Sequence, residues 1–284
     1  MINPKSRDEI TRSLEKRTKE NLDSLQIIED ALLVLRSSIF QMPEPGTRVV
    51  TSLSGGVDSV ACCAILLEAF QLEVFPFFIN RGHRAKDREM ESIQFFADLF
   101  SKRYPNSFHA PVVMNVDIPP KSIKPLLDGN KNHDVGIPMR NSIINEYGVQ
   151  YAFALSSKAS PVRNVFCALV ASDGDFMFHS TLTALRSQML HTCIDMSDSS
   201  WQVSSVAIER EIGHYLDKAD LIQIAAGMDM PLERSRTCYS ADILHCGACE
   251  ACYDRKSAFE KAGIQDKTEY TDTRSAALIK PSYL

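Results

Sequence analysis

The residues best suited to chemistry in this chain form the segment Ser54-Gly55-Gly56-Val57-Asp58-Ser59. It follows an apolar run and precedes a helical pattern, so we expect a buried strand, a glycine turn and a helix. Glycines let an anion reach the backbone N–H groups of the turn, and the start of a helix adds unpaired N–H groups and a positive dipole end. The serine hydroxyls can donate to phosphate oxygens, and Asp58 can hold a cation that accompanies a polyphosphate. The segment therefore predicts a nucleotide-phosphate site.

This glycine turn is not a Walker P-loop, because that motif requires a lysine directly after its last glycine and none is present here. Ser-Gly-Gly-Val-Asp-Ser instead resembles the PP-loop of the ATP pyrophosphatase superfamily. The resemblance implies that the turn grips the β- and γ-phosphates while chemistry occurs at the α-phosphate. AMP would be transferred to a substrate oxygen, and pyrophosphate would leave. The alternative is an ordinary strand-to-helix turn, which the flanking serines and aspartate disfavour.

A second group of chemically competent residues lies near the C-terminus. It holds half of the 8 cysteines: Cys238, Cys246, Cys249 and Cys252. Two successive C-x-x-C steps with a fourth thiol nearby suit a tetrahedral Zn²⁺ held by four thiolates, a structural site with no open position. Three cysteines at two-residue spacing also suit an iron–sulfur cluster. Zinc is the favoured metal, and the cluster stays open as the alternative.

The elements that must position these residues alternate between strands and helices. We expect strands at residues 49–53, 74–79, 111–116, 165–171 and 203–208. Between and after them we expect helices at residues 58–70, 88–103, 138–157, 181–193 and 218–228. Such alternation implies an α/β fold with a Rossmann-like parallel sheet of about five strands. Ligands of these sheets bind at the carboxyl ends of the strands, where the glycine turn and the loop after residue 79 both fall.

Three regions are predicted along the chain. Residues 1–45 form an N-terminal helical extension, because apolar residues between positions 5 and 40 recur at helical spacing, as one helix or a helical pair. Residues 46–215 form the nucleotide-binding domain. Residues 216–284 form a helical zinc-binding region. The polar, Pro/Gly/Lys-rich stretch 117–136 is interpreted as a mobile loop over the site.

Composition limits the classes of function. The 284 residues carry a formal net charge of -5, so no broad basic surface for nucleic acid is indicated. No apolar run is long enough to span a bilayer, and the N-terminus is polar and charged rather than signal-like. We therefore expect a cytoplasmic protein with no membrane partner. In that compartment the cysteines favour metal binding or buried thiols over disulfides.

Beyond the glycine turn, two further blocks point to a family. They are the loop at 138–141 and the stretch 237–259, which contains all four clustered cysteines. Together with the PP-loop they resemble 7-cyano-7-deazaguanine synthase, the QueC family of PP-loop (adenine nucleotide alpha hydrolase type) enzymes. The similarity runs from about residue 49 to residue 266. The C-terminal block is its most specific part, because many PP-loop enzymes lack it.

The resemblance implies a reaction and a set of site residues. ATP, with Mg²⁺, would adenylate the carboxylate of 7-carboxy-7-deazaguanine; ammonia would give an amide, and a second activation a nitrile. The residues implied to bind ATP and Mg²⁺ are Ser54, Gly55, Gly56, Val57, Asp58, Ser59 and Asn80. Asp58, Arg140 and Asn141 are implied to be catalytic, with a surface ion pair as the alternative for Arg140. Lys218 lies in the slot of a lysine-bearing helix of the family, and we expect it to be structural or solvated. The resemblance also implies a homodimer.

Two loops depart from the family pattern and carry the predicted substrate-binding residues. After the second strand, Asn80-Arg81-Gly82-His83-Arg84 lacks the family's tyrosine, and Arg84 is predicted to contact substrate. After the fourth strand, Asp173 or Asp175 could accept N–H donors from the guanine-like edge of a deazapurine, and Phe176 could stack on the base. These departures suggest a divergent relative of the type found in antiviral defence systems. Such a relative would join the deazaguanine to an amine of an acceptor protein.

Three other interpretations stay open at this point. The chain could be the nitrile synthase of queuosine biosynthesis itself, or a tRNA-modifying PP-loop enzyme. The net charge and the short tail disfavour the tRNA-modifying class. It could also be a non-catalytic protein that keeps nucleotide as a structural ligand, which the intact Ser-Gly-Gly-Val-Asp-Ser motif disfavours.

Overall fold

A five-stranded parallel sheet forms the centre of the protein and confirms the predicted fold class. The computed structural model describes residues 3–129 and 136–278. The strands are β1 (Arg48–Ser52), β2 (Glu73–Asn80), β3 (Val112–Asn115), β4 (Asn164–Cys167) and β5 (Gln202–Ser205). They lie in the order β3-β2-β1-β4-β5, all paired in parallel. The strand order therefore reverses between β1 and β4, which is the place where such sheets bind ligands.

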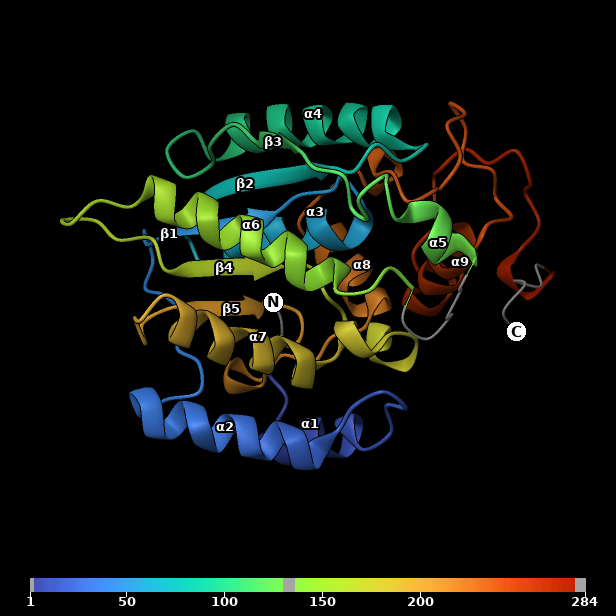
Figure 1. Cartoon of the computed structure of the whole chain (residues 1–284). Helices are drawn as coiled ribbons and strands as arrows, with labels where there is room; N and C mark the ends of the chain where they lie inside the picture. The colour runs from blue at the N-terminus through green and yellow to red at the C-terminus, as the bar shows by residue number, and fades with distance from the viewer. Residues whose placement is uncertain (1–2, 130–135, 279–284) are drawn as a thin grey trace.

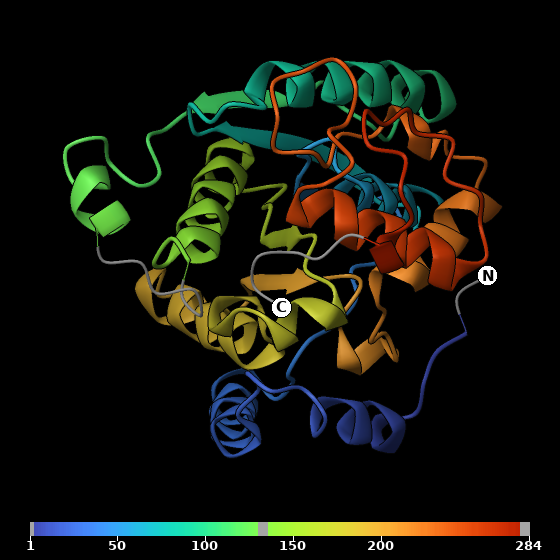
Figure 2. The ribbon, with the colours of Figure 1, turned by 90° about the vertical axis from the view of Figure 1, so that its right-hand side faces the viewer.

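Helices cover both faces of this sheet (Figures 1 and 2). On one face, α6 (Arg140–Leu155) packs on β1 and β4, and α7 (Leu182–Asp195) packs on β5. On the other, α3 (Val57–Ala64) packs against α8 (Lys218–Gly227), which contacts α9 (Glu250–Ala262). Burial from both sides explains why β2 carries six consecutive buried residues instead of alternating ones.

The remaining elements differ from the sequence predictions in a few places. The helix predicted over residues 58–70 ends as a π-helical turn, η1 (Ile65–Ala69), and α4 (Lys86–Arg103) follows β2. The stretch 117–136 contains a short helix, α5 (Lys124–Gly129), and the rest of that predicted loop lies partly outside the described residues. The short helical turns are η2 (Ala171–Asp175), η3 (Phe178–Ser180), η4 (Arg210–Ile212), η5 (Leu232–Arg234) and η6 (Ala276–Leu278). None of the described helices is both long and apolar enough to cross a bilayer.

The N-terminal extension forms the helical pair, α1 (Arg7–Leu14) and α2 (Leu22–Arg36). Each helix begins at a side-chain cap: Ser6 and Glu9 form a capping box for α1, and Asn21 accepts the N–H of Ser24 in α2. Both helices lie along the edge of the molecule beside α7 (Figure 1). Their buried apolar residues join the same hydrophobic core as the sheet. The domain boundaries stay a prediction.

A buried ionic network fastens α2 to the main body. Arg186 of α7 is fully buried and forms a bidentate pair with Glu209, in which Nη1 donates to Oε2 at 2.8 Å. Glu29 of α2, also fully buried, accepts from Arg186 at 3.4 Å and from Arg210. Arg7 and Glu211 make longer contacts with this network, 3.7 Å to Glu29 and 3.8 Å to Arg210, so removal of a central member leaves a buried charge poorly compensated.

We therefore expect Glu29→Ala to lower the free energy of unfolding by about 3 kcal/mol, because Arg210 and Arg186 lose their shared acceptor. Chemical denaturation followed by circular dichroism measures this change. The matched control is Asp30→Ala, one residue along the same helix but exposed, for which the change should stay within about 0.5 kcal/mol. Equal effects of the two substitutions would show that the network contributes nothing specific.

Candidate active site

The glycine turn after β1 is held rigidly by two other segments. Gly55 has a φ of +74°, and a Cβ there would lie 2.9 Å from Ser92 Cβ and 3.1 Å from the carbonyl oxygen of Glu89. Its own carbonyl oxygen accepts from the Ser92 hydroxyl at 2.8 Å and from the N–H of Arg236 at 2.8 Å. Both its conformation and its close contacts therefore require glycine at this position.

Helix α3 starts at this turn with Gly56 as its N-cap, and no side chain of the described residues caps it. The Ser59 hydroxyl donates to the carbonyl of Gly56 at 3.0 Å and accepts the N–H of Ser54 at 3.1 Å. The N–H groups at the start of α3 are thus left without a side-chain acceptor. Such a helix start is suited to an anion.

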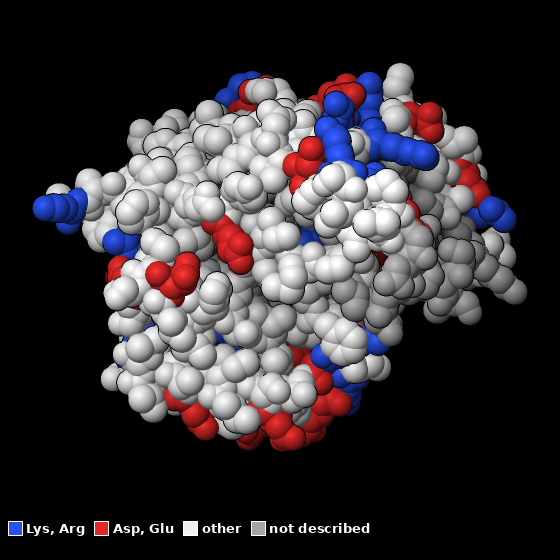
Figure 3. All heavy atoms as spheres, in the orientation of Figure 1, with Lys and Arg blue, Asp and Glu red and all other residues white. Residues whose placement is uncertain are grey.

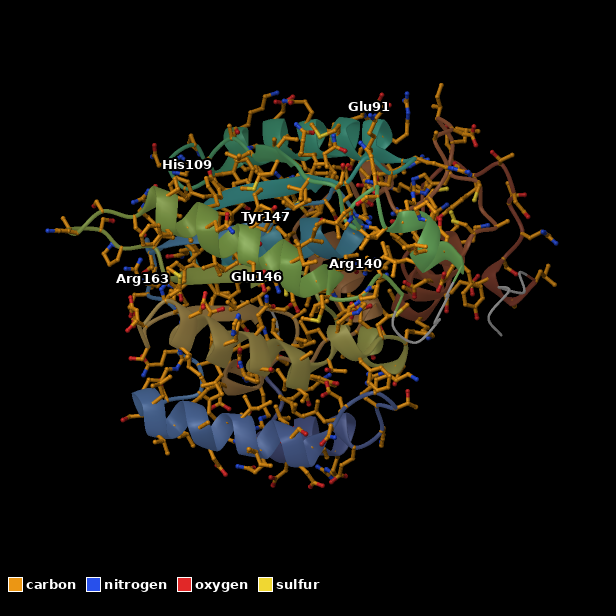
Figure 4. All side chains as sticks on the ribbon, viewed as in Figure 1. Glu91, His109, Arg140, Glu146, Tyr147 and Arg163 are labelled. Atoms are coloured by element: carbon orange, nitrogen blue, oxygen red, sulfur yellow. The ribbon has the colours of Figure 1, made fainter. Side chains whose placement is uncertain are left out.

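A cavity of about 310 Å³ opens beside the turn at the carboxyl ends of β1, β2 and β4. It brings together six of the predicted site residues: Ser54, Gly56, Asp58, Ser59, Arg140 and Asn141. Gly55 and Val57 do not line it, because both are buried behind the turn. Figure 4 shows Arg140 at the end of α6 nearest the carboxyl ends of the strands. Arg163, just before β4, lies at the amino ends of the strands.

Asp58 offers one free carboxylate oxygen to this cavity. Its Oδ2 lies 3.3 Å from Nζ of Lys218, while its Oδ1 is buried and has no hydrogen-bond partner among the described residues. Burial raises the pKa of Asp58, and the charge of Lys218 opposes that shift. An unpartnered carboxylate oxygen beside a phosphate-binding turn fits a hard cation such as Mg²⁺.

Lys218 is not solvated, since only 8 % of it is exposed. Its ammonium group contacts Asp58 and also Asp254 of α9. Burial would lower the pKa of Lys218, but the carboxylates of Asp58, Asp254 and Asp173 raise it well above its ordinary value. Lys218 is therefore a charged group that contacts the site from behind Asp58, and Asp254 is a partner of Lys218 that the sequence analysis missed.

Two guanidinium groups face the cavity, and the sequence analysis named only one. Arg81 lines it together with Arg140, and the pKa of Arg81 is lowered by burial and by the charge of Arg140. Mutual repulsion between buried cations favours an anionic ligand. Strand periodicity does not identify Arg81, because it follows the end of β2 and because the consecutive residues Phe77, Phe78 and Ile79 all line the cavity.

Two residues predicted in the same loop lie elsewhere. Asn80 donates to Asn115 Oδ1 at 2.8 Å and accepts the N–H of Gly82 at 3.1 Å, so its amide serves the loop and does not line the cavity. Arg84 is exposed and does not line it either. Their assigned roles stay predictions without support from this geometry.

The predicted base-reading residues surround the site at a distance from the cavity. Asp173 accepts the N–H of Val170 at 3.1 Å, and burial raises its pKa to about 7. Asp175 pairs with Arg17 at 2.6 Å. Phe176 is 48 % exposed. None of the three lines the cavity, and a role in substrate binding stays a prediction for each.

The four cysteines converge as the spacing predicts. Their Sγ atoms all lie within 4.8 Å of one another, and the Cys238–Cys249 and Cys246–Cys252 pairs are each 3.9 Å apart. Zn–S bonds of about 2.3 Å give a tetrahedral edge of about 3.8 Å, so this set could hold a metal ion. Hydrogen bonds from the thiols of Cys249 and Cys252 and from backbone N–H groups lower the pKa of Cys238 far below its ordinary range.

A glycine allows the close approach that shapes this cluster. Gly247 has a φ of +77°, and a Cβ there would lie 2.0 Å from the carbonyl oxygen of Asp272. The ammonium of Lys256 donates to the carbonyl oxygens of Gly247 at 3.0 Å and Asp272 at 2.7 Å. The turn between the ligands is thus pinned to the chain that follows α9.

The parallel sheet and the glycine turn at its switch point define a protein of the PP-loop fold class. The family model described as "Queuosine biosynthesis protein QueC" matches residues 48–263. The chain therefore belongs to the QueC family, and it is an ATP-dependent, C–N bond-forming synthase.

Curated relatives agree with this assignment. The 7-cyano-7-deazaguanine synthase of Methanothermobacter thermautotrophicus is 26% identical over 242 residues, covering 79% of this chain and 100% of the relative. The synthase of Acetivibrio thermocellus is 28% identical over 236 residues, covering 79% and 98%. Among solved structures, the U34-tRNA thiolase NcsA from Methanococcus maripaludis with its [4Fe-4S] cluster matches with a TM-score of 0.36 and 12% identity, covering 84% of this chain and 73% of that one. The NH3-dependent NAD synthetase from Campylobacter jejuni gives 0.36 and 12%, covering 74% of each chain.

The raised pKa of Asp173 has a measurable consequence. Since its folded pKa of about 7 exceeds the ordinary value of 3.8, the stability it contributes is full below about pH 4 and is lost as the pH rises through 7. Asp173→Asn removes this titration. We expect the Tm of the variant minus that of the wild type to increase between pH 4 and pH 7.5, measured by calorimetry without nucleotide.

The control for this experiment is Ser172→Ala, which keeps the carboxyl group and should follow the wild-type pH dependence. A Tm difference for Asp173→Asn that stays flat over the same range would show that Asp173 is ionised normally.

Proposed function

We propose that this protein uses ATP to adenylate the carboxylate of 7-carboxy-7-deazaguanine, or of a close deazapurine, and then passes the acyl group to ammonia or an amine. The observation that carries the proposal is one cavity that combines the glycine turn, a free oxygen of Asp58 and the guanidinium groups of Arg81 and Arg140. The two guanidinium groups suit the anionic triphosphate and carboxylate, and the carboxylates of Asp58 and Glu89 in the same lining suit an accompanying cation.

A carboxylate is a poor acyl donor, because its leaving group would be oxide. It must therefore be activated before an amine can attack it. Attack of a carboxylate oxygen on the α-phosphorus gives an acyl adenylate, from which AMP can leave. The N–H groups at the start of α3 would hold the β- and γ-phosphates. Asp58 would hold Mg²⁺, which stabilises the charge of the departing pyrophosphate. Arg81 and Arg140 would neutralise the α-phosphate and the substrate carboxylate and orient them for attack.

The charge distribution supports a small-molecule substrate. Figure 3 shows Lys and Arg side chains gathered near the start of α4, while Asp and Glu side chains collect over α1 and α2. With a net charge of -5, a local basic area favours a small anion over a polynucleotide.

The more specific part of the proposal concerns the nucleophile that accepts the acyl group. The altered loop at residues 80–84 and the N-terminal extension motivate an antiviral-defence relative, in which an amine of an acceptor protein takes the place of ammonia. The nitrile synthase reaction of queuosine biosynthesis is the alternative for the same site. Assembly as a homodimer is expected for either.

The first test supplies ATP, Mg²⁺ and 7-carboxy-7-deazaguanine and measures pyrophosphate. We expect release that depends on the acid, and a loss of at least about 100-fold in kcat/KM for Asp58→Asn, because the cation ligand is removed. Asp98→Asn, an exposed aspartate of α4, is the matched control and should behave like the wild type. Mass spectrometry with and without ammonium identifies an adenylate, amide or nitrile.

Two results would contradict this proposal. One is pyrophosphate release that requires tRNA instead of the acid, which would establish a tRNA-modifying enzyme. The other is acid-dependent release that Asp58→Asn leaves unchanged, which would place the chemistry outside this cavity.

We further propose that the cysteine cluster holds Zn²⁺ as a structural ion. Four thiolates leave no open coordination position, and the sulfur–sulfur distances suit a single ion, so the cluster would stabilise the chain around α9 and take no part in acyl transfer.

Elemental analysis of the purified wild type should find about one zinc per chain. Cys252→Ala should lose it and unfold at lower temperature, because the ligand set is broken. Cys193→Ala removes a buried thiol outside the cluster and should retain the metal. Iron with visible absorbance in the wild type would identify an iron–sulfur cluster instead.

A further inference from the structure

The N-terminal extension lies outside the region matched by the family model, which begins at residue 48. It is nevertheless attached to two segments that border the active site. These are residues 171–183, which contain η2 and η3, and residues 206–218, which end at Lys218. Figures 1 and 2 both show the extension beside α7, on the side of the molecule where these segments lie.

Arg17, in the turn between α1 and α2, joins these two segments. Its Nη1 donates to Asp175 Oδ2 at 2.6 Å, and its Nη2 donates to Asp217 Oδ1 at 3.0 Å. The guanidinium lies 5.7 Å from the ring centroid of Tyr215, and the side chain is 17% exposed. The planar fork of an arginine holds two separate carboxylates in one fixed geometry.

The neighbours of Arg17 extend the attachment along residues 174–183. The N–H of Lys19 donates to the carbonyl of Gly174 at 3.1 Å, and the Thr18 hydroxyl donates to the carbonyl of Asp175 at 3.0 Å. The carboxylate of Glu20 accepts the N–H groups of Leu182 at 2.6 Å and Thr183 at 3.2 Å, at the start of α7. These bonds satisfy backbone groups that would otherwise be orphaned at the helix start.

Both attached segments lead directly to cavity residues. Asp217 is the N-cap of α8 and precedes Lys218, which contacts Asp58. From the other segment, the Ser180 hydroxyl accepts from the amide of Asn141 at 3.0 Å. A shift of either segment would therefore change the placement of groups that line the cavity.

The glycine turn, in contrast, is held by Ser92 and Arg236, which lie on segments other than the extension. The site therefore has two parts: the glycine turn proposed to bind phosphate, and the residues whose contacts are supported by residues 17–20.

We propose that Arg17 is a positioning residue for the acid substrate, and that the N-terminal extension is an integral part of the substrate side of this active site. The inference rests on the proposed function for the identity of the acid. Its physical content is that the fork of Arg17 sets the distance between η2 and the start of α8, and so supports Ser180, whose hydroxyl accepts from Asn141 of the cavity.

The kinetic test measures pyrophosphate release for Arg17→Ala while the acid and ATP are varied separately. We expect KM for the acid to rise about tenfold, because Ser180 and with it Asn141 are displaced, while KM for ATP changes less than about twofold, because Asp254 still holds Lys218 beside Asp58. Arg17→Lys should fall between the two proteins, since a flexible ammonium keeps the charge but does not fix the two carboxylates as a planar fork does. Arg12→Ala is the control: that arginine is exposed, and its Nε donates to Asp8 of its own helix.

A second measurement does not depend on activity. Hydrogen exchange of the apo protein, followed by mass spectrometry, should show faster exchange at residues 171–183 and 213–218 in Arg17→Ala and unchanged exchange at residues 54–64. Unchanged exchange in all three segments would overturn the inference, and so would equal increases in the two KM values. If the wild type does not use the acid, the proposed function fails, and exchange alone then decides whether Arg17 holds the wall. If Arg17→Ala does not fold, Arg17→Lys supplies both readouts.

Discussion

One buried ammonium group connects the parts of this molecule that must work together. Lys218, at the start of α8, contacts Asp58 of the phosphate-binding helix and Asp254 of the C-terminal helix. Without its charge, Asp58, Asp173 and Asp254 would repel one another inside a region of low dielectric. Protonation of a carboxylate would then be the most favourable way to reduce this repulsion. The state of Asp58 that can hold a cation therefore depends on Lys218, which makes the lysine essential to the site even though it does not line the cavity.

Helix α9 contributes residues both to the cysteine cluster and to the contacts of Lys218. Within five consecutive residues, Cys252 joins the thiol cluster, Asp254 meets Lys218, and Lys256 binds the carbonyl groups of the cysteine turn. Arg255, fully buried between them, donates to the Ser235 hydroxyl at 2.7 Å and to the carbonyl of Leu232 at 2.8 Å. One helical segment thus orients the metal ligands and the wall of the active site. A rigid supporting shell of this kind is what a reacting constellation requires.

The sequence was informative wherever a pattern is local. The apolar run, glycines and helix start at residues 48–64 specify their own structure, and two-residue spacing brings three cysteines together without knowledge of the rest of the chain. Long-range pairings could not be predicted in this way. Asp175 is paired with Arg17, 158 positions away, and nothing in the local pattern around it indicates that partner. Arg84 was predicted in place of Arg81, because both follow the end of β2 and the alternation along the strand does not distinguish them.

Gly55 has a consequence that reaches beyond its own turn. The backbone amide that holds its carbonyl belongs to Arg236, only two positions before the first cysteine of the cluster. The backbone conformation near Cys238 thereby also influences the conformation of the glycine turn. A change at the thiols, such as their oxidation, would act on the glycine turn through the short backbone segment between Arg236 and Cys238. A change in the redox state or the metal supply of the cell that alters the cysteine cluster would therefore also act on the glycine turn after β1.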